Sequence, residues 1–518
     1  MNPMLQKLKL SLTRPAVSTL TLAFFLILIP FERWASSLRL ILLWATLAAW
    51  VIEHRDAGTH GSARGTGISR KQWLVATVGT LAGLSALTTL SLWLGRGTGT
   101  LWETLQEVFQ RGLPVALVAP PLIGALRTCR KNANPAGFDR WLWLALGGFA
   151  LWVVFTSCFS LDPNVSFRYI FKEAGPYFLL YLVFWGKLAE RSENAGRWIL
   201  WMVLISGLIG LCAVLIYVCI HLMPAIVGDT LDKAEWIRRD WIGNGRRMAR
   251  VQFPFVEHNR LSSYLLTGLV LTPVALMMER RRWVQFSLYI LAGGLFLGIA
   301  ASGTRGAMIA ALPVIGIIAA IRIRPIMIVS MVVLIGFVWM LAPATSRMHL
   351  GNIFEPETYL NPAGSIKYRY RAWEDTMRMI GDRPLLGLGY GWPIFEQVYP
   401  EYSGAATEKV KPHAHNNLLQ VSVETGLVGL VLFGMYQISL LLGTVWPPGR
   451  ATRSWSARSA LLAVWVGLFL YGLTNYSMRR TVGFVVWLDL ALLHFLIVGA
   501  AVEEGAERQS YEIPQQNA

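Results

Sequence analysis

Charged residues are scarce in this chain, and several common catalytic motifs are missing. Only 15% of its 518 residues are Asp, Glu, Lys or Arg, whereas 54% are apolar. There is no His-Glu-x-x-His, Walker or Gly-x-Ser-x-Gly sequence, which excludes the corresponding metalloprotease, P-loop and α/β-hydrolase sites. A soluble protein of this length cannot bury so much apolar surface, so a bilayer must serve as part of its solvent.

Cysteines and acidic clusters are also few. The four cysteines have neither metal-binding nor redox spacing, and we interpret them as unpaired thiols: Cys129, Cys158, Cys212 and Cys219. The close acidic pairs of the largest polar loop are Glu355 with Glu357 and Glu374 with Asp375. A divalent-metal transferase normally needs a stronger carboxylate cluster, so we predict no metal site and no cofactor.

The net charge of +17 is explained better by membrane topology than by nucleic-acid binding. The basic residues are scattered through short loops, and no nucleic-acid-binding motif is present. Lys7, Lys9 and Arg14 precede a first helix that has no cleavage site. With the N-terminus inside, every even-numbered connection is basic, as the positive-inside tendency requires. The opposite face then carries residues 159–173, 223–257, 302–306 and 344–417.

Hydropathy predicts an all-α polytopic membrane protein. About fourteen apolar segments are present, four of them marginal, so about twelve spans are equally plausible. We predict a transmembrane bundle at 1–343, a large outer loop at 344–417, further membrane helices at 418–500 and a disordered cytoplasmic tail at 501–518. The segments are 16–31, 38–52, 73–95, 110–126, 141–158, 174–188, 198–222, 258–278, 284–302, 307–321, 326–343, 418–443, 459–476 and 482–500.

The two longest outer loops have features of their own. Residues 365–380 carry apolar side chains at helical spacing, and Pro384 ends this predicted helix. Glycines at 387, 389 and 391 predict a flexible turn after it. Loop 223–257 keeps several basic residues despite its exported position, either as salt-bridged surface or as a site for an anionic headgroup.

Histidines stand where the large loop enters the next apolar segment. His413 and His415 are followed by Asn416, and an imidazole with a pKa near about 6.5 can take a proton at neutral pH. The alternative is a histidine that only caps a helix at the interface. Gly426 and Gly429 favour the functional interpretation, because they allow close packing that would hold the histidine on a rigid element.

Arginines gather on the same face. Arg305, in Ser302-Gly303-Thr304-Arg305-Gly306-Ala307, lies between two apolar helices, where a guanidinium is costly unless it meets an anion or snorkels to headgroups. Arg250 precedes the helix that starts near residue 258. The predicted loop helix adds Lys367, Arg369 and Arg371, of which the first and last share one face. For each of these basic residues, a solvent-exposed surface position is the alternative to contact with a ligand.

Histidine with several arginines suits sugar transfer from a lipid pyrophosphate. That leaving group needs charge neutralisation more than a strong general acid, and arginines supply it through bidentate contacts. His415 could take the proton of the attacking hydroxyl. In-line attack would invert the anomeric centre.

These residues resemble the bacterial O-antigen ligases, within the superfamily that also holds O-antigen polymerases and protein O-oligosaccharyltransferases. The motif that carries the resemblance is His415-Asn416-x9-Gly426-x-x-Gly429. The turn around Arg305 is similar to the family's Ser-Arg-Gly-Ala-type turn, and Arg369-x-x-x-Trp373 with Pro384-Leu385-Leu386-Gly387-x-Gly389 resembles its loop helix. The similarity covers roughly residues 245–445, with Leu430-Val431 where the ligases usually have Thr-Trp.

The resemblance implies a GT-C-like bundle of about twelve helices in the bacterial inner membrane, with a periplasmic active site. It implies undecaprenyl-pyrophosphate-linked O-antigen as donor, lipid A–core oligosaccharide as acceptor, and metal-independent inverting transfer. The family's functional residues map onto His415, Arg305 and Arg250. Membrane lipids are the other expected partners, and no nucleic-acid partner is expected. The rival functions are O-antigen polymerase, protein O-oligosaccharyltransferase and a lipid-linked glycan transporter, although no repeated halves support the transporter.

Overall fold

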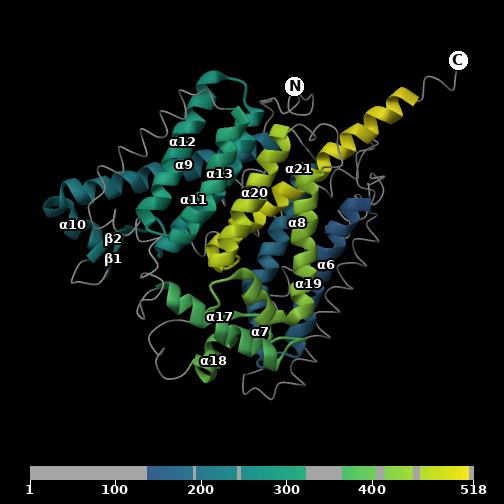
Figure 1. Ribbon diagram of the computed structural model, residues 1–518. Coiled ribbons are helices and arrows are strands. Elements are labelled where there is room, and N and C mark those ends of the chain that lie inside the picture. Colours follow the sequence, from purple (N-terminus) through teal and green to yellow (C-terminus); the bar gives the residue numbers. More distant parts are fainter. Residues whose placement is uncertain are drawn as a thin grey trace, which may run out of the picture.

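The computed structural model describes residues 137–190, 194–241, 247–322, 365–403, 413–446 and 455–512. Helices make up most of this part, as predicted (Figure 1). Residues 1–136 and 323–364 lie outside it, and with them the expected apolar segments at 16–31, 38–52, 73–95, 110–126 and 326–343.

One group of helices surrounds α11 (His258–Met278). This helix packs against α9 (Asn194–Leu222), α12 (Arg282–Ser302), α13 (Arg305–Arg322) and α20 (Trp455–Thr474). Every residue from Arg260 to Leu276 is buried. Hydroxyl side chains are tolerated there because they bond to the helix itself, as when Thr272 donates to the carbonyl of Gly268 at 2.9 Å.

A second group stands beside it and consists of two packed pairs. Helix α6 (Gly137–Cys158) packs on α19 (Asn417–Val445), and α8 (Gly175–Glu190) packs on α21 (Arg480–Glu512). Helix α21 extends to Glu512, so the chain continues as helix into the region predicted to be a disordered tail from residue 501. The short helix α7 (Pro163–Tyr169) and the π-helical turn η1 (Ile170–Ala174) connect α6 to α8.

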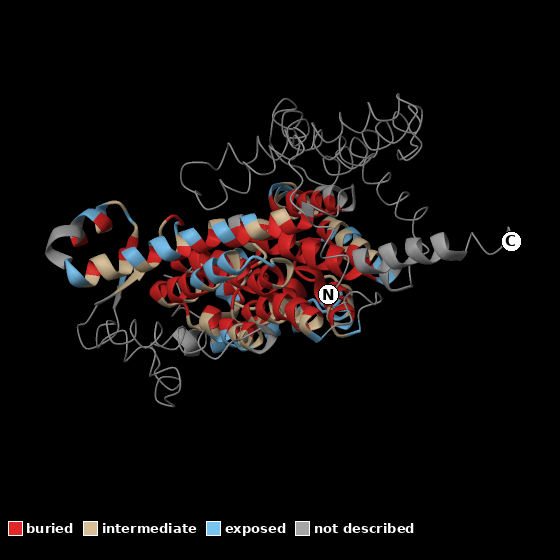
Figure 2. Ribbon diagram, turned by 90° about the horizontal axis from the view of Figure 1, so that it is seen from above, coloured by how far each residue is buried: buried red, intermediate tan, exposed pale blue. Residues whose placement is uncertain are grey.

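Six helices of the described part are long and apolar enough to cross a membrane: α6, α9, α11, α12, α19 and α20. Two shorter apolar helical stretches, Arg305–Ala319 and Val482–Val498, accompany them. Buried residues fill the centre of the bundle (Figure 2), while α9 and α19 leave large apolar side chains exposed, among them Leu215 and Val431. Apolar helices with exposed apolar faces confirm a multi-pass helical membrane protein. The count of about twelve spans stays a prediction.

The connection at 223–257 is folded, which corrects the expectation of an irregular loop in an all-α protein. It begins with α10 (Pro224–Lys233) and continues as an antiparallel hairpin of β1 (Ile237–Trp241) and β2 (Arg247–Val251). Arg239 forms an ion pair of 2.6 Å with Asp232, and both groups are partly exposed. Of the two alternatives for the basic residues of this loop, Arg239 therefore fits the salt-bridged surface.

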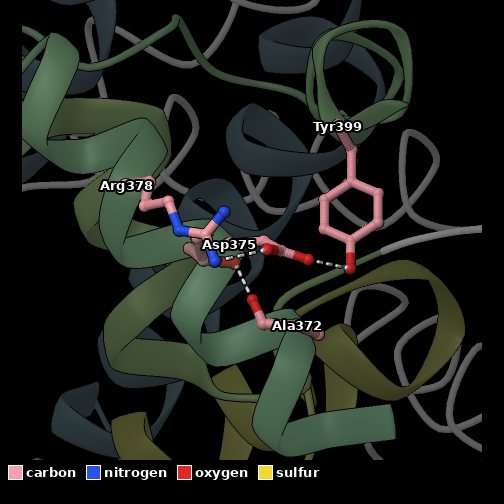
Figure 3. Close-up of polar contacts among 5 residues, drawn as sticks. Ala372, Asp375, Arg378 and Tyr399 are labelled. Atoms are coloured by element: carbon pink, nitrogen blue, oxygen red, sulfur yellow. Dashed lines mark hydrogen bonds and ion pairs between the residues drawn. The ribbon is translucent and has the colours of Figure 1, made fainter. Parts of the chain in front are cut away.

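Helix α17 (Ser365–Asp382) confirms the helix predicted at 365–380, and it ends before Pro384 as expected. It packs against α18 (Trp392–Ser403) at the end of the bundle where α19 begins (Figure 1). Tyr399 donates a hydrogen bond to buried Asp375 at 3.1 Å, and Arg378 lies 3.6 Å from the same carboxylate (Figure 3). Asp375 therefore fastens the two helices to each other.

Candidate functional site

The Gly426 motif of the sequence marks a break in α19. Gly426 has φ 72° and ψ −179°, so the outer turns of the helix, which start at Asn417, are offset from its long inner part. A Cβ atom at Gly426 would lie 2.0 Å from the carbonyl oxygen of Leu385. Only glycine fits this approach and this backbone conformation. The prediction of close packing is confirmed, but the helix is interrupted there rather than continuous.

The glycine-rich segment after Pro384 fills the break. Leu388 and Gly389 donate their N–H groups to the carbonyls of Val423 and Glu424 at 2.8 and 3.1 Å, and Leu427 donates to the carbonyl of Pro384 at 2.7 Å. These bonds satisfy backbone groups that the break frees from the helix. The expected flexible turn is thus a fixed connection between the α17–α18 pair and the outer part of α19.

The two histidines stand directly above this outer part. Asn416 caps it, since its side-chain oxygen accepts hydrogen bonds from the N–H groups of Leu418 and Leu419 at 2.8 and 3.3 Å. Asn416 therefore has a structural role as the N-cap of α19. His415 has φ 48°, a left-handed conformation that is unusual for a residue with a side chain. The rings of His413 and His415 have centroids 3.7 Å apart.

Both histidines are neutral near pH 7. Burial lowers the pKa of His415 to about 2, helped by His413 and Arg369. Burial likewise lowers the pKa of His413 to about 3, and Arg479 and Arg369 lower it further while Glu257 opposes them. Low dielectric and nearby positive charge both disfavour an imidazolium. The pair therefore presents uncharged rings beside guanidinium groups.

Three of the arginines predicted from the sequence come together. Burial lowers the pKa of Arg369, and the charges of Arg305 and Arg250 lower it further, so both of these guanidinium groups are within electrostatic range of Arg369. Arg250 lies on β2, 3.0 Å from Nε2 of His258 through its Nη1. We call Arg250, Arg305 and Arg369 the arginine cluster. Such a concentration of positive charge favours an anionic ligand.

The turn that carries Arg305 is held by hydroxyl contacts. Gly303 ends α12 in the left-handed conformation with φ 66°. Thr304 then donates to the side-chain oxygen of Asn259 at 3.2 Å, and Ser302 donates to the Thr304 hydroxyl at 3.1 Å. These contacts fix the first residue of α13, which is Arg305.

Two other predicted residues are not placed in the cluster. Arg371 is exposed, because a residue two positions from Arg369 points away on a helix. The side chain of Lys367 lies outside the described residues, although α17 includes its position. In the described ranges no group of three His, Cys, Asp or Glu residues is arranged to hold a metal ion.

Sequence reasoning missed two charged residues, of which Arg479 is within electrostatic range of His413 and of the other, Glu173. Glu173 lies on η1 and is buried, and Arg479 lies just before α21. The Arg479 guanidinium stacks on the ring of Trp392, 4.2 Å from its centroid. Neither residue belongs to a recognisable motif, since each stands beside another charged residue, Lys172 or Arg480, in a short connection between apolar segments. The sequence therefore carried no specific signal for them.

Comparison with known proteins matches the part of the chain that holds most of this site. Residues 289–434 match the family described as O-Antigen ligase. This segment includes Arg305, α17, α18, the histidine pair and the break in α19, whereas Arg250, Glu173 and Arg479 lie outside it.

Similar proteins are found in the genus Rickettsia. A protein of Rickettsia bellii named "Putative polysaccharide ligase" is 26% identical over 125 residues, which cover 23% of this chain and 29% of the relative. A protein of the same name from Rickettsia felis is 25% identical over 127 residues, or 23% of this chain and 30% of the relative. The match thus spans less than a third of these relatives. Over residues 289–434 the chain is similar to the O-antigen ligase family, which confirms the resemblance that its motifs gave.

Proposed function

We propose that the protein is an O-antigen ligase. It transfers a glycan from undecaprenyl pyrophosphate to lipid A–core oligosaccharide at the periplasmic face of the inner membrane. The observation that carries the proposal is the position of the neutral histidine pair beside Arg369, which is itself within range of Arg305 and Arg250. A proton acceptor and an anion site are thereby adjacent, as transfer from a glycosyl pyrophosphate requires.

The arginine cluster binds the donor pyrophosphate. Guanidinium groups form bidentate contacts with phosphate oxygens, and they oppose the charge that develops on the leaving group. Without a bound anion, Arg305 and Arg250 each repel Arg369. The transfer needs no metal in this account, because the arginines neutralise the pyrophosphate.

His415 receives the proton of the acceptor hydroxyl or positions that hydroxyl. The hydroxyl oxygen bonds to the anomeric carbon as the bond from this carbon to the pyrophosphate oxygen breaks, with inversion. The proton passes to the imidazole and the electron pair leaves with the pyrophosphate. Burial is the main cause of the low pKa of His415, and bound pyrophosphate would offset only the smaller contribution of Arg369. The donor thus removes one of the effects that keep the imidazole from taking a proton.

The exposed apolar face of α19, with Val431 and Met435, offers a lipid-facing surface for the isoprenoid chain of the donor. The cavity lined by Asn417, Phe433 and Leu490 holds only about 20 Å³, which is too small for such a chain.

Deletion of the gene tests this function against its nearest rival. Loss of a ligase leaves lipid-linked polymer in the membrane and unmodified lipid A–core. Loss of an O-antigen polymerase leaves single repeat units on the core instead. Unchanged lipopolysaccharide together with loss of glycan from an exported protein would identify a protein O-oligosaccharyltransferase.

A further inference from the structure

We propose that Glu173, Arg479 and Trp392 form a second subsite, which binds a sugar of the acceptor through its hydroxyl groups. The identification of this sugar as the acceptor rests on the function proposed above. The subsite is distinct from the arginine cluster, and His413 joins the two, because both Arg479 and Arg369 act on its imidazole.

Glu173 is a buried carboxylate without a direct side-chain partner in the part of the chain that the structure describes. Its side chain is only 8% exposed. Arg479, Lys172 and Arg260 act on it electrostatically, but within the described ranges no side chain donates a hydrogen bond to it and no cation forms an ion pair with it within 4.0 Å. Burial raises the pKa of Glu173, and Arg479, Lys172 and Arg260 oppose this shift. A ligand that donates hydrogen bonds to the carboxylate would stabilise its ionised form.

Arg479 offers the complementary donor. Its guanidinium stacks on Trp392, and its buried Nε has no hydrogen-bond acceptor in the part of the chain that the structure describes. Glu173 and Arg479 thus interact electrostatically, but within the described residues they form no ion pair. A ligand that both donates and accepts hydrogen bonds would serve the two groups together, and the hydroxyls of a sugar do both.

The surroundings of Glu173 suit a neutral sugar. Glu424, which lies within electrostatic range of Glu173, is a second carboxyl group, and in either protonation state it does not attract a phosphate as an arginine would. Aromatic side chains gather around the subsite: Tyr169 meets Trp392 edge to face at 6.3 Å, and Tyr390 lies within electrostatic range of both Glu173 and Arg479. Aromatic rings beside a few polar groups are typical of a site that binds a small polar ligand.

The position of Glu173 is set by the backbone. It lies in the π-helical turn η1 between α7 and α8, and such turns are frequent at functional sites. The segment just before α18 is close to α7 as well, because a Cβ atom at Gly391 would lie 3.1 Å from Cβ of Tyr169. The subsite is therefore assembled from α7, η1, the start of α18 and the segment before α21.

Calorimetric binding of lipid-free core oligosaccharide, released by mild acid from the lipopolysaccharide of the source cell, tests the proposal. The full-length protein in detergent should bind this probe. Glu173→Gln should weaken binding on the order of 10-fold, because a hydrogen bond to a charged group is lost. Arg479→Lys should weaken it as well, since lysine lacks the planar guanidinium. Glu401→Gln, an exposed carboxylate on α18, is the matched control and should bind like the wild type.

The same preparations separate this inference from the proposed function. Arg305→Gln should lose transfer from the lipid-linked donor but keep oligosaccharide binding, whereas Glu173→Gln should raise the KM for acceptor and leave the KM for donor unchanged. Wild-type protein that binds the probe but transfers no glycan would contradict the proposed function alone. Wild-type protein that fails to bind the probe, or variants at 173 and 479 that bind it normally, would overturn the subsite.

Discussion

The backbone N–H of Leu427 donates a hydrogen bond to the carbonyl of Pro384 at 2.7 Å. This bond crosses from the inner part of α19 to the segment that follows α17. It joins the two sequence motifs that carry the family resemblance, and it exists because α19 is broken at Gly426. The positions of the histidine pair and of Arg369 on α17 therefore depend on the break in α19.

Gly426→Ala should lower the stability of the protein by about 1–3 kcal/mol or more, because alanine is strained at this backbone conformation and its Cβ would meet Leu385. Thermal unfolding in detergent measures the loss. Gly434→Ala is the control on the same helix, since a Cβ there has no neighbour within 4 Å. Equal unfolding temperatures for both variants would show that the break is not required.

His415→Ala should reduce glycan transfer by about 100-fold or more, the usual range for loss of a group that transfers a proton. The protein should still insert in the membrane and unfold at a similar temperature. The measurement is polymer-bearing lipopolysaccharide in a deletion strain that expresses the variant at wild-type abundance. Normal decoration of lipid A–core would remove His415 from the mechanism.

Arg369→Lys should impair transfer on the order of 10-fold, because lysine keeps the charge but loses the bidentate contact with phosphate. Arg371→Lys on the same helix should keep full activity, since its side chain is exposed away from the cluster. Initial rates of glycan transfer, measured with the purified variants, compare the two residues. An impaired Arg371 variant beside a normal Arg369 variant would instead place the helix face of Lys367 and Arg371 at the donor.

The histidine pair should make folding sensitive to acid. Both pKa values are depressed in the folded state, to about 2 and about 3, from 6.5. The stability that this represents is complete above pH 6.5 and is lost as the pH falls from there toward the folded values. His413→Asn with His415→Asn should therefore flatten the decline of the unfolding temperature between about pH 6.5 and 5. An unchanged slope would indicate that the imidazoles are not buried as described.

Much of the helical layout was predictable, because hydropathy reports burial in lipid or protein directly. The segment 258–278 coincides with α11, and 365–380 falls within α17. The hairpin at β1 and β2 was missed, since the strand Ile237–Trp241 is rich in arginine and lacks clear alternation. Long-range pairing with Arg247–Val251, rather than local preference, makes it a strand.

The site was predictable in part for a similar reason. His415, Arg305 and Arg369 stand in motifs, so their types and spacing could be recognised. The meeting of Arg369 with Arg305 and Arg250 depends on how α17 lies over the bundle, which no local pattern encodes. Glu173 and Arg479 stand in no recognisable motif, and only tertiary packing brings Arg479 within electrostatic range of both Glu173 and His413.

Reconstitution tests the central claim most directly. Purified protein in liposomes is given undecaprenyl-pyrophosphate-linked glycan and lipid A–core, with and without EDTA, and the product is resolved on a gel. The account predicts that glycan moves to lipid A–core at the same rate in both conditions and that the His415→Ala protein forms none. Failure of the wild type to form this product, its dependence on a chelatable metal, or growth of polymer on a second lipid-linked repeat would contradict it.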